Sequence, residues 1–345
     1  MNLIQATLSG DPVPRRPLWI MRQAGRVLPE YRALKEKHSF LELSRDPELA
    51  AEVTLLPFRH FDFDAAITFA DIMSPLPALG VQLDFSPGPV LEKPIRSAAD
   101  VAALPEPEEL DPEQIAPEVA ATQRIVAGEL PAHRALLGFV GAPLTLAAYL
   151  IQGQGERDFP ALRAFVYSEP EAFSELLRKL TGLTAKYAKS QFEAGAEAIQ
   201  VFDSWAGLLE VADWRRHVRP HLLNLLDELG EAGVPRILFL HSAPQLVPSF
   251  LELPCEVLGV DWRTDLVELR AQRPDLCLQG NLDPALLLAP PDVVRRHTEA
   301  FLQRMPPRGH IVNLGHGLLP QTPLDSIHAF FETVRSEQLD GVRTA

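Results

Sequence analysis

The sequence predicts an α/β fold, a single-domain (β/α)8 TIM barrel with the active-site cleft at the carboxyl ends of its strands. Short apolar runs alternate with longer helical patterns eight times along the chain. Polar or ionisable residues follow these apolar runs, at the face that carries catalysis in barrel enzymes. We therefore expect one domain over residues 1–345, with an N-terminal extension at 1–16 and a C-terminal tail at 336–345.

Eight apolar runs have the length and composition of buried strands. They cover residues 17–20, 65–69, 136–140, 198–202, 237–240, 257–260, 276–278 and 311–314. A doubly wound open sheet is the alternative fold. It predicts a glycine-rich phosphate-binding fingerprint after the first strand, and Arg-Gln-Ala-Gly-Arg at 22–26 is not one.

Helical patterns separate these runs. They cover residues 29–38, 112–130, 170–194, 211–230, 291–303 and 323–334, and a further helix is expected to start at Asp46-Pro47. Asp46 has the chemistry of an N-cap, and proline is favoured in the first turn of a helix. Proline is dense at 84–94 and 104–112, so both stretches are expected to be irregular.

The composition limits the classes of function. With 46% hydrophobic and 23% charged residues, the chain can bury a large core. A formal net charge of -14 argues against a nucleic-acid partner. The N-terminus has no signal-peptide pattern and no apolar run is long enough to cross a bilayer, so no membrane association is expected. Cys255 and Cys277 lie in apolar surroundings and are expected to be free thiols, which predicts a cytoplasmic protein.

The first apolar run ends in a turn that carries two arginines. Arg22 and Arg26 flank a short segment that contains Gly25, which allows close approach of a ligand to the backbone. A guanidinium pairs with a carboxylate or a phosphate through two parallel hydrogen bonds. The turn therefore predicts an anion-binding site, although arginines beside a helix are more often simple surface residues.

Seven motifs then resemble one known family. WIMRQAGRVLPEYR (19–32) is similar to the N-terminal signature of the uroporphyrinogen decarboxylases. Later segments also resemble this family, in the same order: FADIM (69–73), GAPLTLAAYL (141–150), FDSWAG (202–207), GVDWRT (259–264), QGNLDP (279–284) and NLGHG (313–317). The resemblance runs from Pro17 to about Pro323.

This resemblance implies a lyase of haem (porphyrin) biosynthesis. Such an enzyme would convert the four acetate side chains of uroporphyrinogen III to methyls, giving coproporphyrinogen III and CO2. The family implies no cofactor and no metal, a polycarboxylate tetrapyrrole as the small-molecule substrate, and a homodimer. Because the chain is acidic overall, the attraction for this substrate is expected to come from a local cluster of arginines at positions 15, 16, 22, 26 and 32.

The resemblance also assigns the site residues. The catalytic residues would be Asp71, Arg22 and Arg26, with Asp71 accepting the pyrrole N–H groups and the arginines holding carboxylates. The substrate-binding residues would be Arg22, Gln23, Ala24, Gly25, Arg26, Asp71, Tyr149, Phe202, Ser204 and His316.

The residue types alone leave plainer interpretations open for several of these positions. Asp71 and Ser204 also have the chemistry of helix caps. Tyr149 could be a core aromatic residue with its hydroxyl at the rim. A lone histidine such as His316 is more often structural, although its flanking glycines at a strand end favour a substrate contact.

Four positions depart from the family pattern and keep alternatives open. Val27, Gln152 and Gln321 replace a tyrosine and two acidic residues. Residues 240–244 read Leu-His-Ser-Ala-Pro in place of a lysine- and glycine-rich turn. Zinc-dependent corrinoid or thiol methyltransferases share this barrel and carry a His-x-Cys pair here, but the position two after His241 is Ala243. A non-catalytic tetrapyrrole-binding protein is the other alternative.

Overall fold

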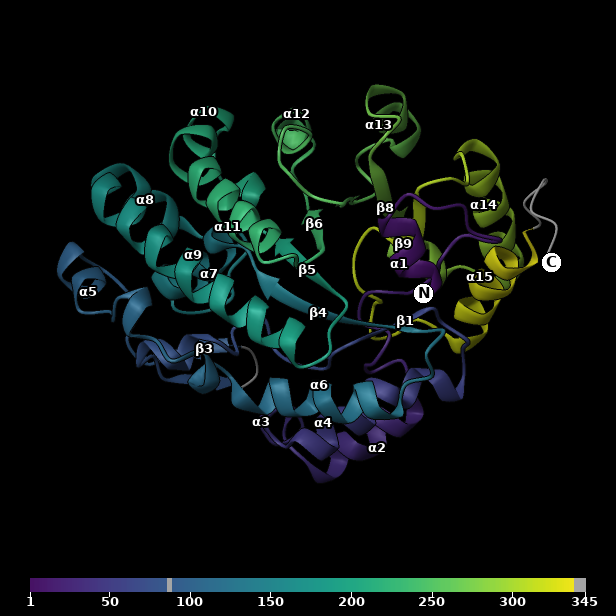
Figure 1. Ribbon diagram of the computed structural model, residues 1–345, viewed down its shortest axis with the longest axis horizontal. Coiled ribbons are helices and arrows are strands. Elements are labelled where there is room, and N and C mark those ends of the chain that lie inside the picture. Colours follow the sequence, from purple (N-terminus) through teal and green to yellow (C-terminus); the bar gives the residue numbers. More distant parts are fainter. Residues whose placement is uncertain (86–88, 338–345) are drawn as a thin grey trace. The chain divides into compact units, whose positions relative to one another are not determined.

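The computed structural model describes residues 1–85 and 89–337 and confirms the α/β class (Figure 1). Seven strands form a parallel sheet in the order β1-β4-β5-β6-β7-β8-β9. Their bounds are β1 Ala65–Ile67, β4 Ala135–Gly141, β5 Ala198–Asp203, β6 Arg236–Leu240, β7 Val257–Val260, β8 Cys277–Leu282 and β9 His310–Leu314. Strands buried on both sides read as continuous apolar runs, which is why the sequence revealed them.

Contacts divide the chain into two compact units. The first comprises residues 1–69, 124–137 and those from 256 onward, and the second comprises 70–123 and 138–255. The first contains the pairs β1–β4, β7–β8 and β8–β9, and the second contains β5–β6. A single domain over the whole chain stays a prediction.

Four helices of the first unit lie where the sequence predicts them: α2 Pro29–Lys37, α4 Pro47–Leu55, α14 Pro291–Arg304 and α15 Leu324–Ser336. The same unit contains α1 Leu3–Leu8, α3 Phe40–Arg45 and α13 Leu266–Gln272, which were not predicted. Asp46 caps α4 as expected, because its side chain accepts a hydrogen bond from the Leu49 N–H. The yellow and olive helices α14 and α15 lie side by side in Figure 1.

Helices of the second unit include α5 Ala98–Ala102, α7 Pro143–Gln152, α8 Pro160–Ser168, α9 Pro170–Glu193, α10 Val211–Asp213, α11 Arg219–Glu231 and α12 Val247–Phe250. The helix α6 Pro117–Glu129 passes from one unit into the other. Helices α7, α8 and α9 pack together (Figure 1). The helix predicted at 211–230 is present but contains a π-helical turn at Trp214–Val218.

The first predicted strand is reduced to a single bridge. Leu18 pairs in parallel with Val312 of β9, and the Val312 N–H donates to the Pro17 carbonyl at 2.8 Å. On its other side, the Leu18 carbonyl accepts from the Asp64 N–H at 2.9 Å, just before β1. Pro17 has no N–H to donate, and the Ile20 N–H bonds to the Gln23 side chain, so no longer ladder can form here. This segment thus takes the predicted place between the last and the first strand of the sheet.

The prediction of irregular structure at 84–94 was wrong. Strands β2 Leu83–Phe85 and β3 Pro89–Leu91 pair in an antiparallel manner, with residues 86–88 outside the described part. The Leu91 N–H donates to the Gly153 carbonyl at 2.7 Å, and Val90 bridges to Gln154. Partners sixty residues away therefore support the hairpin, and they leave no local signal.

The expected N-terminal extension is described in full, and the expected C-terminal tail only in part. Helix α1 lies in the predicted extension 1–16, where Ile4 is fully buried, and it lies beside β9 in Figure 1. Of the predicted tail 336–345, residues 338–345 lie outside the described residues. No helix in the described ranges has the length and apolarity that a bilayer crossing requires.

A buried polar cluster joins the extension to β9. The Arg16 Nη1 donates to His310 Nδ1 at 2.8 Å, and Arg16 Nη2 contacts the Glu337 carboxylate at 2.8 Å. Since a guanidinium can only donate, the His310 proton is on Nε2, which donates to the Gly280 carbonyl at 2.7 Å. Burial, together with the positive charge of Arg16, lowers the pKa of His310 to about 3.

We expect this histidine to make the fold acid-sensitive. A lowered pKa means that its contribution to stability is complete above pH 6.5 and is lost as the pH falls towards 3, because the unfolded chain binds the proton more tightly. At pH 5, unfolding of the wild type should take up about one more proton than unfolding of His310→Gln. Urea unfolding at several pH values from 7 to 4 measures this difference as the slope of the free energy of unfolding against pH. Equal slopes for the two proteins would contradict the prediction.

Candidate active site

The predicted anion-binding turn lies in the first unit, at the end of the bridged segment. Its backbone is fixed on two sides: the Met21 N–H donates to the Asn313 side chain at 3.1 Å, and the Met21 carbonyl accepts from the Leu318 N–H at 3.0 Å. Arg22 follows with an exposed side chain and a left-handed backbone, φ 61°. This conformation costs a non-glycine residue roughly 1–2 kcal/mol, and such strain occurs most often at functional sites.

The motif that follows β9 packs against Arg22. Half-buried His316 lies between Gly315 and Gly317, and a Cβ on Gly317 would lie 2.3 Å from Arg22 Cδ. Position 317 must therefore lack a side chain if the Arg22 side chain is to keep its path. Two segments that the sequence linked to binding, 22–26 and 315–317, are thus brought together.

The other residues of the turn have different surroundings. The Gln23 amide accepts from the Ile20 N–H at 3.1 Å and donates to the Ala65 carbonyl at 3.0 Å, so this buried side chain holds the turn. Ala24 is half-buried. The Gly25 carbonyl accepts from the Leu28 N–H at 3.0 Å, which leads the chain into α2, and Arg26 is exposed.

The expected cluster of five arginines is smaller than predicted. Arg15 forms a bidentate pair with the buried Asp64 carboxylate at 2.7 and 2.8 Å, and Arg16 is the buried partner of His310. Arg32 donates to the carbonyls of residues 26 and 27. These three arginines serve the scaffold, so we correct the cluster to the exposed pair Arg22 and Arg26.

The remaining predicted residues lie in the second unit. Asp71 is half-buried, and its Oδ1 accepts from the Met73 N–H at 2.8 Å, which closes a turn two residues on rather than capping a helix, because the next helix begins only at Leu76. Burial, with further contributions from Glu118 and Asp71, raises the pKa of the nearby Tyr187. A Cβ on Gly141 would lie 3.0 Å from Ile72 Cγ1, so the glycine lets the Asp71 segment pack against the end of β4.

Phe202, Ser204 and Tyr149 lie around the end of β5, and all three are half-buried. The Phe202 ring makes edge contacts with Phe139 and Phe239 on the neighbouring strands, at centroid distances of 5.8 and 5.6 Å. The Phe202 carbonyl also accepts from the Ala142 N–H at the start of α7.

Asp203 precedes Ser204 and is fully buried. Burial raises the pKa of its carboxyl group to about 7, which the hydrogen bond from Thr145 and the nearby Trp214 indole offset only in part. Its Oδ1 accepts from the Thr145 hydroxyl at 3.3 Å, while Oδ2 makes no close hydrogen bond within the described ranges. Burial thus favours the uncharged form of this group.

Sequence reasoning missed Thr145 and Gly317 as supports of the site. Thr145 lies four residues before Tyr149, a spacing that places both on one face of a helix and could have drawn attention to it. Gly317 was noted only as a glycine beside His316, because its contact with Arg22, almost 300 positions earlier, leaves no local signal.

The loop at 241–244 is the segment that departs from the family pattern. Its His241 ring stacks on the Phe239 ring, with centroids 6.3 Å apart, and its Ser242 has a left-handed backbone, φ 55°. Cys255 is half-buried and Cys277 is buried, and both are free thiols. Among residues 1–85 and 89–337, no three His, Cys, Asp or Glu side chains are grouped as metal ligands.

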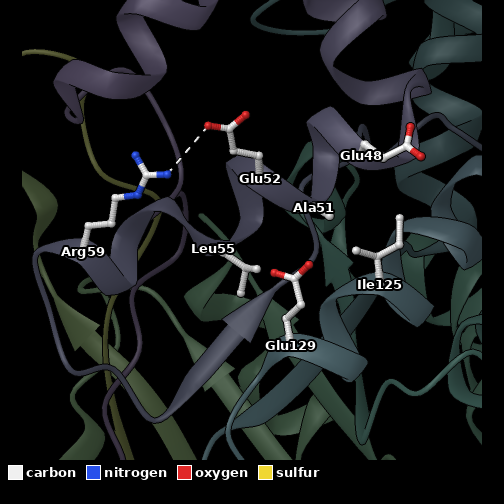
Figure 2. A pocket seen from close by; sticks show the side chains of 7 residues that line it. All are labelled: Glu48, Ala51, Glu52, Leu55, Arg59, Ile125 and Glu129. Atoms are coloured by element: carbon white, nitrogen blue, oxygen red, sulfur yellow. Dashed lines mark ion pairs between the residues drawn. The ribbon is translucent and has the colours of Figure 1, made fainter.

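A groove between α4 and α6 has none of the predicted site residues in its lining (Figure 2). Its wall carries the carboxylates of Glu48, Glu52 and Glu129, and Glu52 lies 3.7 Å from Arg59. An acidic wall repels a polycarboxylate, so this groove is not a candidate for the anion-binding site.

Comparison with known proteins gives one consistent family. A family model described as uroporphyrinogen decarboxylase (URO-D) matches residues 1–337. A protein named uroporphyrinogen decarboxylase from Syntrophotalea carbinolica is 46% identical over 316 residues, 91% of each chain. Another of that name from a Nocardioides species is 44% identical over 330 residues, 95% of this chain and 94% of the relative.

Solved structures of low identity share the fold. A methyltransferase from Methanosarcina mazei superposes with a TM-score of 0.78 at 17% identity, covering 96% of this chain and 97% of that one. A putative vitamin-B12-independent methionine synthase from Listeria monocytogenes superposes with a TM-score of 0.53 at 14% identity, covering 94% and 96%. At such identities the likeness concerns the fold alone.

The left-handed conformation of Arg22 can be tested by stability. Glycine is favoured at φ 61°, so Arg22→Gly should be more stable than Arg22→Ala by about 1 kcal/mol. The same two substitutions at Arg26, which is not among the described residues with positive φ, should show alanine as stable as glycine or more so. Urea unfolding of the four variants measures both differences. If the glycine variant were more stable than the alanine variant at both positions, the strain assigned to Arg22 would be contradicted.

Proposed function

The chain belongs to the uroporphyrinogen decarboxylase family, and we propose that it decarboxylates all four acetate side chains of uroporphyrinogen III without a cofactor. It is a carboxy-lyase of tetrapyrrole biosynthesis. The observation that carries the proposal is the extent of the match, because relatives of this name align over more than nine tenths of both chains. The product would be coproporphyrinogen III with four molecules of CO2.

We propose that Arg22 and Arg26 hold substrate carboxylates. Both side chains are exposed, and both belong to one turn whose backbone is fixed by Asn313 and Leu318. A guanidinium is charged at all relevant pH values, so this pair can neutralise an anion but is a poor proton donor. Gln23 would support the turn, Ala24 and Gly25 would leave room for the ligand, and His316 would contact the substrate.

Asp71 would carry the electrostatic part of the chemistry. Protonation of a pyrrole ring carbon puts positive charge on the ring, and the C–C bond to the carboxylate can then break, with its electron pair neutralising the ring. A second proton then adds to the exposed methylene carbon, and loss of the proton first placed on the ring carbon restores the pyrrole with a methyl group, so one proton is consumed for each CO2 released. A fixed carboxylate beside the pyrrole N–H groups stabilises the cationic intermediate, which is a large catalytic effect in a site shielded from water.

The residues Tyr149, Phe202 and Ser204 would bind the rest of the macrocycle. Phe202 presents an aromatic ring supported by Phe139 and Phe239. Tyr149 and Ser204 bring hydroxyl groups that can donate to carboxylates. By resemblance to the family we further propose a homodimer located in the cytoplasm.

Anaerobic incubation of the chelator-treated protein with uroporphyrinogen III tests the proposed function. We expect seven-, six-, five- and then four-carboxyl porphyrins after oxidation of the products, without added cofactor, as the acetates are lost one by one. Chromatographic counting of carboxyl groups measures this. Tight binding with no loss of carboxylates would indicate the tetrapyrrole-binding alternative. Neither binding nor turnover would indicate the methyltransferase alternative, which a zinc assay would then test.

Two substitutions at Asp71 separate the effect of its charge from that of its hydrogen bond to the Met73 N–H. Asparagine can still accept the Met73 N–H through its Oδ1, whereas alanine cannot, and neither carries a charge. If the charge acts in catalysis, both variants should lose about a hundred- to thousandfold in kcat. If Asp71 only closes the turn to Met73, Asp71→Asn should retain wild-type kcat, and only Asp71→Ala should unfold more easily.

A further inference from the structure

One hydroxyl group joins helix α7 to the end of β5. Thr145, in the first turn of α7, is fully buried, and its Oγ1 accepts from the Ser204 N–H at 3.0 Å. The same hydroxyl donates to Asp203 Oδ1 at 3.3 Å. It therefore contacts two consecutive residues of the segment that follows β5, one through the main chain and one through the side chain.

A second contact lies one helical turn further along. The Tyr149 ring packs edge-on against Trp205, with centroids 6.3 Å apart, and against Phe159 at 5.7 Å. Phe159 and Trp205 contact each other at 4.6 Å. Thr145 and Tyr149, four residues apart on α7, thus meet Ser204 and Trp205, which are neighbours in the chain.

We propose that Thr145 is a positioning residue that fixes the separation of the Tyr149 and Ser204 hydroxyls, and that it acts through its hydrogen bonds to the Ser204 amide and the Asp203 carboxyl group. The inference rests on the proposed function, in which those two hydroxyls bind carboxylates of one macrocycle. Thr145 has no exposed surface, so it acts on the reaction only through its neighbours.

The reason is geometric and electrostatic. The side chain of Ser204 is carried by a backbone whose N–H has one buried acceptor, Thr145 Oγ1. Without that acceptor the N–H must find another partner, and the carboxyl group of Asp203 loses one of its donors at the same moment. Either change rotates the Ser204 peptide, and a shift of about 1 Å in a substrate-positioning group can cost about a hundredfold in rate.

Three threonine variants test this proposal in the full-length protein. Thr145→Val keeps the shape but removes the hydroxyl, while Thr145→Ser restores it. Thr184→Val is the matched control, because the Thr184 hydroxyl is equally buried, in α9, but makes no hydrogen bond in the described ranges. We expect kcat/KM for uroporphyrinogen to fall about ten- to hundredfold in Thr145→Val, to recover in Thr145→Ser, and to be unchanged in Thr184→Val.

A double-mutant cycle distinguishes positioning from a general loss of stability. If Thr145 acts through Ser204, Thr145→Val should add little to the loss already caused by Ser204→Ala. Hydrogen exchange adds a readout that needs no substrate: the Ser204 amide should exchange faster in Thr145→Val than in the wild type and in Thr184→Val.

The outcomes separate this inference from the function on which it rests. An active wild type with unchanged kcat/KM in Thr145→Val would overturn the positioning role alone. So would losses that simply multiply in the double mutant, because they indicate independent effects. A wild type that binds uroporphyrinogen but releases no CO2 would overturn the proposed function, and the positioning role in catalysis with it.

Discussion

The buried carboxylate of Asp64 organises the first unit. It accepts hydrogen bonds from the Arg15 guanidinium, from the Leu18 N–H at 2.7 Å and from Arg335 at 2.9 Å, while its own backbone pairs with Leu18 and Ala135. A buried charge is tolerated only with such complete pairing. Through this one side chain, the N-terminal segment, the start of β1 and helix α15 are joined. The segment so fixed leads directly to Arg22, so the position of the turn that we propose to bind anions depends on Asp64.

This arrangement explains how an acidic chain can attract a polyanion. Arg15 and Arg16 have carboxylate partners, Asp64 and Glu337, so their charges are compensated within the fold. Arg22 and Arg26 stay exposed on a rigid turn. A local pair of guanidiniums acts over a few ångströms, whereas the net charge of -14 acts over a longer range and is screened by salt. Selectivity for a ligand with several carboxylates then depends on close contact rather than on long-range steering.

The sequence predicts the parts of this structure that have local causes. The buried parallel strands appear as apolar runs, and Asp46 marks the start of α4 as its chemistry requires. The failures share a different cause. Nothing in the sequence near Arg15 or Arg16 shows that Asp64 and His310 will accept hydrogen bonds from them. Nothing near β3 shows that the Gly153 carbonyl will accept a hydrogen bond from that strand. Candidate site residues could be assigned only from motif resemblance, because their contacts, such as that of Gly317 with Arg22, join distant positions.

The two aspartates of the second unit show how one fold gives two carboxyl groups different chemistry. Asp71 is half-buried beside a backbone N–H donor, and Asp203 is fully enclosed with a pKa of about 7. A second full negative charge near carboxylate ligands would oppose their binding. Because Asp203 is largely uncharged below pH 7, it can exchange hydrogen bonds with Thr145 at a smaller electrostatic cost. Because burial raises the pKa of Asp203 to about 7, its contribution to stability is complete below the ordinary aspartate pKa and is lost as the pH rises from there through the folded pKa. In the proposed mechanism the charge of Asp71 serves catalysis, while Asp203 supports the β5–α7 contact.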